Sequence, residues 1–134
     1  LEMSLALEEE ALTQGDAAVL LSTFQEAAYF TRATQQRYAA IAKRAAFVGA
    51  LAVGLGDEPA PGVRGASVDA TDPLRGEWDV VVLGPHFAGA FVAQDLEHPA
   101  EDDVDRRFAY AVTYDRDLVT ALATRLMRRV APEH

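Results

Sequence analysis

The chain has 134 residues, half of them hydrophobic, with a formal net charge of −9 and no cysteine. This length predicts a single domain with its own core, and the lack of cysteine excludes disulfides, thiol nucleophiles and thiolate metal ligands. The negative charge repels phosphate backbones, so direct nucleic-acid binding is not expected.

Membrane and export signals are also missing from the sequence. The longest apolar run, residues 45–55, is too short to span a bilayer, and the first residues lack the basic segment and apolar core of a signal peptide. We therefore expect a cytoplasmic domain with no membrane partner. Because Met is the third residue, residues 1–3 are interpreted as a cloning remnant and residues 4–131 as one domain excised from a longer multidomain protein.

The first part of the chain predicts a helix followed by a strand. Residues 4–14 are expected to form a short helix with Ser4 as its N-cap and Gly15 just past its end. The apolar residues 17–24 then predict the first strand of a sheet.

A longer helix is predicted next, starting at Glu26 or Thr31 and ending at Ala46. Its apolar residues recur with helical spacing, so the face with Tyr38 is expected to pack on the sheet. These residues are Tyr38, Ile41, Ala42 and Ala45.

An edge of the sheet is predicted between this helix and the middle of the chain. Residues 47–55 predict a second strand. Residues 56–62 contain two glycines and two prolines and predict a loop, and residues 63–69 can form a short edge strand.

The centre of the predicted sheet lies within residues 72–95. Asp72 followed by a proline predicts one helical turn before Trp78. Residues 80–83 are uncharged and apolar, so this strand is expected to be covered on both faces. After a Gly-Pro break, the connection to the apolar residues 87–93 is too short for a parallel return and predicts a hairpin.

The last part of the chain predicts a loop, a strand and a helix. Residues 97–105 are rich in acids and predict a mobile surface loop, and residues 108–114 alternate as in a half-buried strand. Asp115 is the expected N-cap of a final helix with an apolar stripe and with arginines near its C-terminus, where the helix dipole favours positive charge. The stripe consists of Val119, Leu122, Ala123, Leu126 and Val130.

Together these elements predict an α+β domain. We expect a mainly antiparallel sheet of about five strands, two longer amphipathic helices and one or two short helices.

Reactive side chains do not form a recognisable catalytic or metal-binding pattern. The three histidines lack the spacing of metal ligands, and no serine lies in a nucleophile elbow. The glycines match neither a Walker loop nor a dinucleotide fingerprint. The sequence therefore predicts no metal, no cofactor and no enzyme, and a small uncharacterised enzyme is the weakest alternative.

Aromatic residues at the ends of the predicted strands suggest a binding site, because ligand pockets are mostly apolar with a few polar groups. The competing interpretation is that these rings fill the core and that the arginines pair with nearby acids. The candidate ligand-binding residues are Phe24, Gln25, Tyr29, Phe30, Trp78, His86, Arg107 and Tyr110.

Several motifs recur in a recognisable order: VLLSTFQ, YF, QQRYAAIAKRA, DPLRGEWDVVVLGPHFAGAFVAQDL and RRFAYAVTYDRDLV. Over residues 4–127 this order resembles the DICT family, a sensory domain named for its occurrence in diguanylate cyclases and two-component systems. The resemblance implies an α+β fold and a non-catalytic sensory role. It also implies a fused output domain of the GGDEF, EAL, HD-GYP, histidine kinase, STAS or MerR type, and it supplies no catalytic residue.

The leading hypothesis is thus a sensory or regulatory domain of a bacterial signalling protein that answers to a small molecule, light or a partner. The alternative is a homodimerising interaction domain without a ligand. It is motivated by Leu5, Leu7 and Leu12 on the first helix, because an exposed apolar stripe favours a partner.

Overall fold

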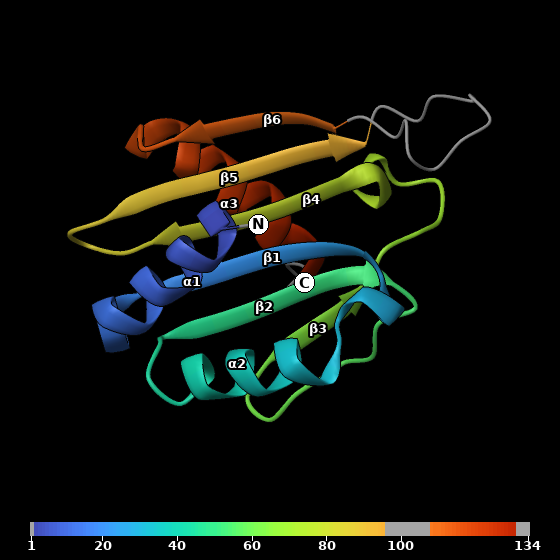
Figure 1. Ribbon diagram of the computed structural model, residues 1–134, viewed down its shortest axis with the longest axis horizontal. Coiled ribbons are helices and arrows are strands. Elements are labelled where there is room, and N and C mark those ends of the chain that lie inside the picture. The colour runs from blue at the N-terminus through green and yellow to red at the C-terminus, as the bar shows by residue number, and fades with distance from the viewer. Residues whose placement is uncertain (1, 96–107, 131–134) are drawn as a thin grey trace.

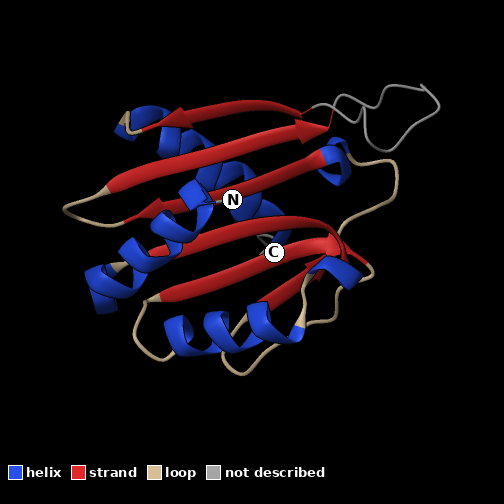
Figure 2. Ribbon diagram, viewed as in Figure 1, coloured by secondary structure: helices blue, strands red, loops and turns tan. Residues whose placement is uncertain are grey.

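The computed structural model describes residues 2–95 and 108–130, which form one mixed sheet with helices on both faces (Figures 1 and 2). The strand order is β3-β2-β1-β4-β5-β6. In chain order the elements are α1 (Glu2–Gln14), β1 (Val19–Glu26), α2 (Arg32–Ala42), β2 (Phe47–Val53), β3 (Arg64–Ser67), β4 (Glu77–Leu83), β5 (Ala88–Asp95), β6 (Phe108–Thr113) and α3 (Arg116–Val130). Single 3-10 turns occupy Gly15–Ala17, Ala27–Tyr29 and Pro73–Gly76.

The predicted α+β class is confirmed, with six strands rather than about five. The sixth strand exists because the short segment β3 pairs with β2 in parallel. β1 and β2 are also parallel, since α2 carries the chain back between them, whereas β1–β4, β4–β5 and β5–β6 are antiparallel. The sheet is therefore mixed, with antiparallel pairs in the majority.

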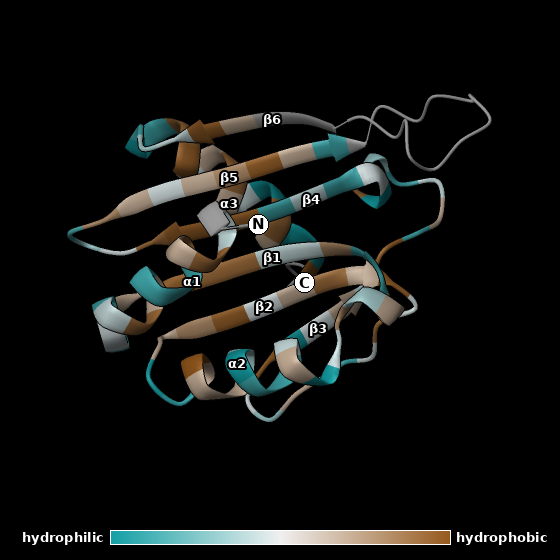
Figure 3. Ribbon diagram, in the orientation of Figure 1, coloured by the Kyte–Doolittle hydropathy of each residue, from teal (hydrophilic) through white to brown (hydrophobic). Residues whose placement is uncertain are grey.

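The helices divide the core into two layers. α1 and α2 cover one face of the sheet and α3 covers the other. Val80 and Val82 of β4 belong to the core under α1 and α2, and Val81 belongs to the core under α3. The prediction that this strand is covered on both faces is confirmed, and Figure 3 shows hydrophobic residues along the central strands.

The helix ends agree with the sequence in part. α1 begins at Glu2, so the prediction of Ser4 as its N-cap is wrong; Glu2 and Met3 are good helix formers and extend the helix upstream. At 13 residues α1 is also longer than α2, which has 11. The predicted end of α1 is confirmed by Gly15, whose φ of +72° is the left-handed conformation that glycine tolerates best.

The predicted caps Asp72 and Asp115 are confirmed by hydrogen bonds, and of the two starts predicted for α2 the later one, Thr31, is right. Thr31 caps α2, Asp72 caps the turn before β4 and accepts from the Leu74 N–H at 2.9 Å, and Asp115 accepts from the Leu118 N–H at 3.1 Å at the start of α3. α2 ends at Ala42 rather than at residue 46. The predicted loop at residues 97–105 lies outside the described residues.

Candidate functional site

The structure gathers Phe24, Gln25, Tyr29, Phe30 and Trp78 near one corner of the sheet, where β1 ends and β4 begins. Phe24 and Phe30 lie 5.0 Å apart between ring centroids. Both are buried. These two rings fill the core at this corner.

In the neighbouring pair, Tyr29 is exposed, whereas Trp78 is half-buried and packs against the core under α1 and α2. Their ring centroids are 5.4 Å apart with planes tilted by 43°, and Tyr29 is 43% exposed. Gln25 precedes this pair at a register shift in β1 and has a φ of +66°, a conformation uncommon outside glycine. The backbone therefore bends at Gln25, and the chain leaves the sheet toward Tyr29.

The remaining predicted residues are not part of this corner. His86 lies in the exposed β4–β5 turn, and the length of β4, roughly 20 Å, separates it from Trp78. Arg107 lies outside the described residues. Tyr110 pairs with Ala93 across β5 and β6, but its side chain is also outside the described part of the chain.

The opposite side of the same β4 segment carries an ionic cluster that holds α3 against the sheet. Arg125 donates two hydrogen bonds to the Glu77 carboxylate, at 3.1 and 2.9 Å. One turn further along α3, Arg129 donates to Asp72 at 2.9 and 3.2 Å. These arginines were expected to serve the helix dipole, whereas the structure shows that they pair with acids on the sheet side.

Asp79 is the most unusual group in this cluster. It is 1% exposed, and its Oδ1 has no hydrogen-bond partner among the described residues. The pKa of Asp79 is raised to about 9. Burial is the largest cause, and the hydrogen bond to Glu77 and the negative charge of Glu77 add to it. Asp79 is therefore a neutral acid at pH 7, and Glu77 carries the charge that Arg125 binds.

A second buried network lies between α1, α2 and β1. The Tyr38 hydroxyl donates to Glu8 Oε2 at 2.7 Å and lies 2.7 Å from Ser22 Oγ. Arg37 Nε donates to Glu8 Oε1 at 3.1 Å. Burial and the neighbouring Glu8 carboxylate raise the pKa of the Tyr38 hydroxyl well above its usual range, so it stays a donor.

We predict that Tyr38→Phe lowers the free energy of unfolding by about 1.5–3 kcal/mol, because the substitution removes a donor from a buried carboxylate. Urea unfolding of the two proteins measures the difference. Tyr29→Phe is the matched control, since the Tyr29 ring is exposed, and it should change stability little. Equal effects of the two substitutions would contradict this role for Tyr38.

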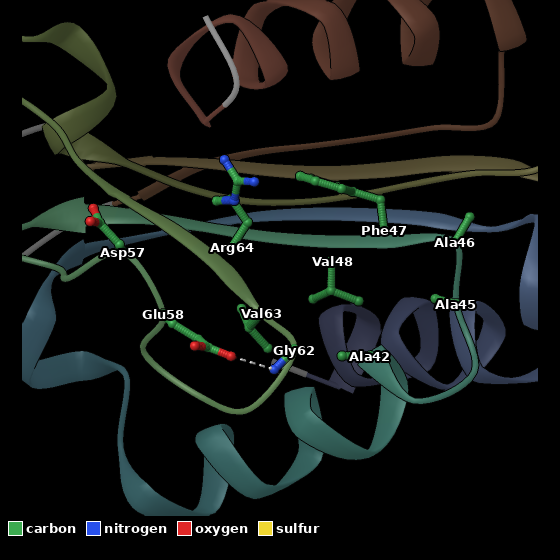
Figure 4. A pocket seen from close by; sticks show the side chains of 10 residues that line it. All are labelled: Ala42, Ala45, Ala46, Phe47, Val48, Asp57, Glu58, Gly62, Val63 and Arg64. Atoms are coloured by element: carbon green, nitrogen blue, oxygen red, sulfur yellow. Dashed lines mark hydrogen bonds between the residues drawn. The ribbon is translucent and has the colours of Figure 1, made fainter.

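A cavity of about 470 Å³ opens at the β3 edge of the sheet, between the end of α2, the start of β2 and the loop before β3 (Figure 4). β3 pairs with β2 only from Gly49 onward, so the first two residues of β2 border this space. Glu58 Oε2 accepts a hydrogen bond from the Gly62 N–H at 3.1 Å and shapes the loop. The walls are formed by Ala42, Ala45, Ala46, Phe47, Val48, Asp57, Glu58, Gly62, Val63 and Arg64.

The charged residues lie on different sides of this cavity. In Figure 4, Arg64 and Phe47 extend to one side of the strands, and Glu58 and Val63 lie on the side of α2. None of the residues around this cavity is predicted as a site residue from the sequence. The available signal is the glycine- and proline-rich loop at residues 56–62 beside a strand, a pattern that by itself predicts only a connection.

Two smaller hollows adjoin the helices. One of about 270 Å³ lies between α1 and α2, and one of about 400 Å³ lies beside α3 at the start of β1 and the end of β4. Within residues 2–95 and 108–130, no group of His, Asp or Glu side chains is arranged to hold a metal ion. In the same part of the chain, no helix has both the length and the apolar character needed to cross a bilayer.

The family model of DICT, the sensory domain in diguanylate cyclases and two-component systems, matches residues 1–96. The chain belongs to the DICT family. The match runs from α1 through β5 and includes the aromatic corner and the cavity, whereas β6 and α3 lie beyond it. No curated protein and no solved structure matches the chain.

Proposed function

We propose that this DICT domain is a non-catalytic sensory module of a bacterial signalling protein, located in the cytoplasm, that passes a conformational change to a fused output domain. The family match over residues 1–96 is the observation that carries the proposal. The output belongs to the GGDEF, EAL, HD-GYP, histidine kinase, STAS or MerR-type classes.

The input is a small molecule bound in the cavity beside β3. Its volume of about 470 Å³ lies within the usual range of ligand pockets, roughly 300–1,000 Å³. Small apolar side chains such as Ala45 and Val48 line its walls, and Asp57, Glu58 and Arg64 offer both signs of charge. These groups suit a compact ligand with an apolar body and at least one polar or charged substituent.

β2 connects this cavity to α3. Phe47, at the start of β2, lines the cavity and also packs against the core under α3. Two residues later, Gly49 faces the end of α3, where an added Cβ would be in ordinary contact with Val130 Cγ1 at 3.4 Å. A ligand that shifts the start of β2 therefore acts on the last turn of α3.

A thermal-shift screen of small metabolites tests this input. A compound that binds only the folded domain raises its stability, by about 2.7 kcal/mol at roughly 100 times its Kd. Arg64→Ala should weaken binding of an anionic hit about tenfold. Arg75→Ala, an exposed arginine outside the cavity, is the matched control and should leave the affinity unchanged. Hits with equal affinity for both variants would argue against this cavity.

The corner with Tyr29 and Trp78 is a second candidate input, because Tyr and Trp are enriched at the centres of protein interfaces. Tyr29 is exposed and packs against Trp78, which is half-buried. Trp78 is the only tryptophan in the chain, so its fluorescence reports on this corner alone. A partner bound there should shift the Trp78 emission, and it should bind more weakly to Tyr29→Ala.

Turnover of a metabolite by the purified domain would instead favour the enzyme alternative.

A further inference from the structure

α3 is joined to the rest of the domain differently from the other two helices. Among the described elements it lies alone on its face of the sheet, whereas α1 and α2 lie on the opposite face (Figure 1). Its first residue, Arg116, donates to the Gly84 carbonyl at 2.8 Å in the turn between β4 and β5. No strand of the described sheet follows α3 in the chain. α3 can therefore turn about its first residues without breaking any pair of strands.

The surface that α3 covers contains an unsatisfied acid. Glu77 and Asp79 lie two residues apart on β4 and face α3. Arg125 binds the Glu77 carboxylate, but Asp79 Oδ1 has no partner among the described residues although Asp79 is only 1% exposed. A buried polar atom without a hydrogen bond costs free energy. Movement of α3 away from the sheet would give this atom water as a partner.

The helices on the opposite face cover a satisfied network. Both oxygens of the Glu8 carboxylate accept hydrogen bonds, Oε1 from Arg37 and Oε2 from the Tyr38 hydroxyl. Within residues 2–95 and 108–130, Asp79 Oδ1 is the only buried side-chain nitrogen or oxygen without a partner. Opening α1 or α2 would break good hydrogen bonds, whereas opening α3 relieves an unsatisfied group.

The leucines of α1 also hold that helix on the sheet. The prediction of an exposed stripe of Leu5, Leu7 and Leu12 is wrong, because Leu7 is buried and Leu12 packs against the core. Only Leu5 is exposed. The surface feature that suggested a homodimer is therefore not present on α1, and α1 is firmly packed.

We propose that α3 opens as a unit while the sheet stays folded, and that Asp79 releases a proton to water when α3 opens and takes one up when α3 closes. The closed form then holds the neutral acid beside Glu77, and the open form holds a hydrated Asp79 carboxylate. Because one proton leaves with each opening, a rise in pH favours the open form. This inference does not rest on what the domain senses.

Asp79 is the only group in this cluster that changes its protonation near neutral pH. The pKa of Asp79 is raised to about 9, mainly by burial. The pKa of Asp72 is lowered by its hydrogen bond with Arg129. Burial raises the pKa of Glu77, but the hydrogen bonds and charge of its neighbours, Arg125 first, outweigh this and the net shift is downward. Both of these carboxylates are therefore ionised in either form between pH 6 and 8.

The remaining neighbours of Asp79 do not titrate in this range. Arginine stays charged at these pH values. β1 and β5 place uncharged residues beside Asp79, namely Thr23, which accepts from the Asp79 N–H, and Val92, which is its partner in the sheet register.

Native-state hydrogen exchange of the full chain, followed by NMR between pH 6 and 8, tests the proposal. We expect the amides of Ala123 and Leu126 in α3 to be protected at least about tenfold less than the most protected amides of β1 and β4. After correction for the intrinsic exchange rate, protection in α3 should fall about tenfold per pH unit. Low concentrations of urea should lower protection in the strands more than in α3, because opening α3 exposes less surface than unfolding does.

Asp79→Asn tests the role of the proton. In this variant protection in α3 should no longer depend on pH, and at pH 7 it should rise by up to about a thousandfold. Asp16→Asn, at an exposed position, is the control and should behave like the original chain. The pH series on the original chain is a separate test that does not require the variant to fold.

Two results would overturn the proposal. Equal protection in α3 and in the strands, with the same dependence on urea, would show that α3 opens only when the whole domain unfolds. Protection in α3 that stays constant from pH 6 to 8 in the original chain would show that opening releases no proton.

Discussion

Replacing Asp79 by asparagine is expected to raise the free energy of unfolding at pH 7, by up to about 4 kcal/mol. Asp79 has a pKa of about 9 in the folded domain and an ordinary value of 3.8. At pH 7 folding must therefore protonate a group that is ionised in the unfolded chain, and this costs free energy. Asparagine keeps the shape and the donor toward Glu77 without that cost.

The pH dependence has a definite sign. Because the folded pKa is the higher one, the contribution of Asp79 to stability is complete below pH 3.8 and is lost as the pH rises toward about 9. The advantage of Asp79→Asn should therefore be close to zero at pH 4, grow through neutral pH and level off near pH 9.

Urea unfolding at several pH values between 4 and 9 measures this difference. Asp16→Asn is the control, because Asp16 is exposed and forms no ion pair within the described part of the chain, and it should show no comparable growth with pH. A constant difference between the Asp79 variant and the original chain would refute a raised pKa. A loss of stability at neutral pH would show that the ionised carboxylate is needed beside Arg125.

Gly65→Ala is expected to lower the free energy of unfolding by about 3 kcal/mol. The added Cβ would meet the Gly56 carbonyl oxygen at 2.1 Å and Pro59 Cδ at 2.6 Å, and neither a backbone oxygen nor a proline ring can rotate away. The loop before β3 must then move off the strand. Since Asp57 and Glu58 in that loop line the cavity, ligand affinity should fall as well.

Gly56→Ala, in the same loop, is the matched control because a Cβ there meets no atom within 4 Å. Thermal and urea unfolding should separate the two alanine variants clearly. Similar stability of both variants would show that the loop yields easily. In that case it would not hold the cavity wall in place.

Much of the local structure follows from short-range patterns. The apolar run of β4, the Gly-Pro break after it and the return along β5 predict a hairpin without any knowledge of distant residues. Asp72 and Asp115 are predicted as caps because their side chains accept hydrogen bonds from backbone only two or three residues away. The error at Ser4 arises at the same level, since helix propensity upstream outweighed a good capping residue.

The candidate site was far less accessible to such patterns. Trp78 and His86 both lie close to the ends of the predicted central strand and are grouped for that reason, yet opposite ends of a strand cannot share a pocket. Glu77 and Asp79 lie two apart on a strand and so face the same side, where Arg125 meets them. Only the placement of α3 on that face shows that these charges belong together.

By itself the sequence determined the α+β class, the order of the elements, the two-sided burial of β4 and membership of the DICT family, because periodicity, turn residues and motif order are local properties of the chain. The tertiary structure decided which groups meet: the residues around the cavity beside β3, and the neutral buried Asp79 with its partners under α3. These features depend on strand order and helix placement, which arise from contacts between residues far apart in sequence. No local pattern encodes such contacts.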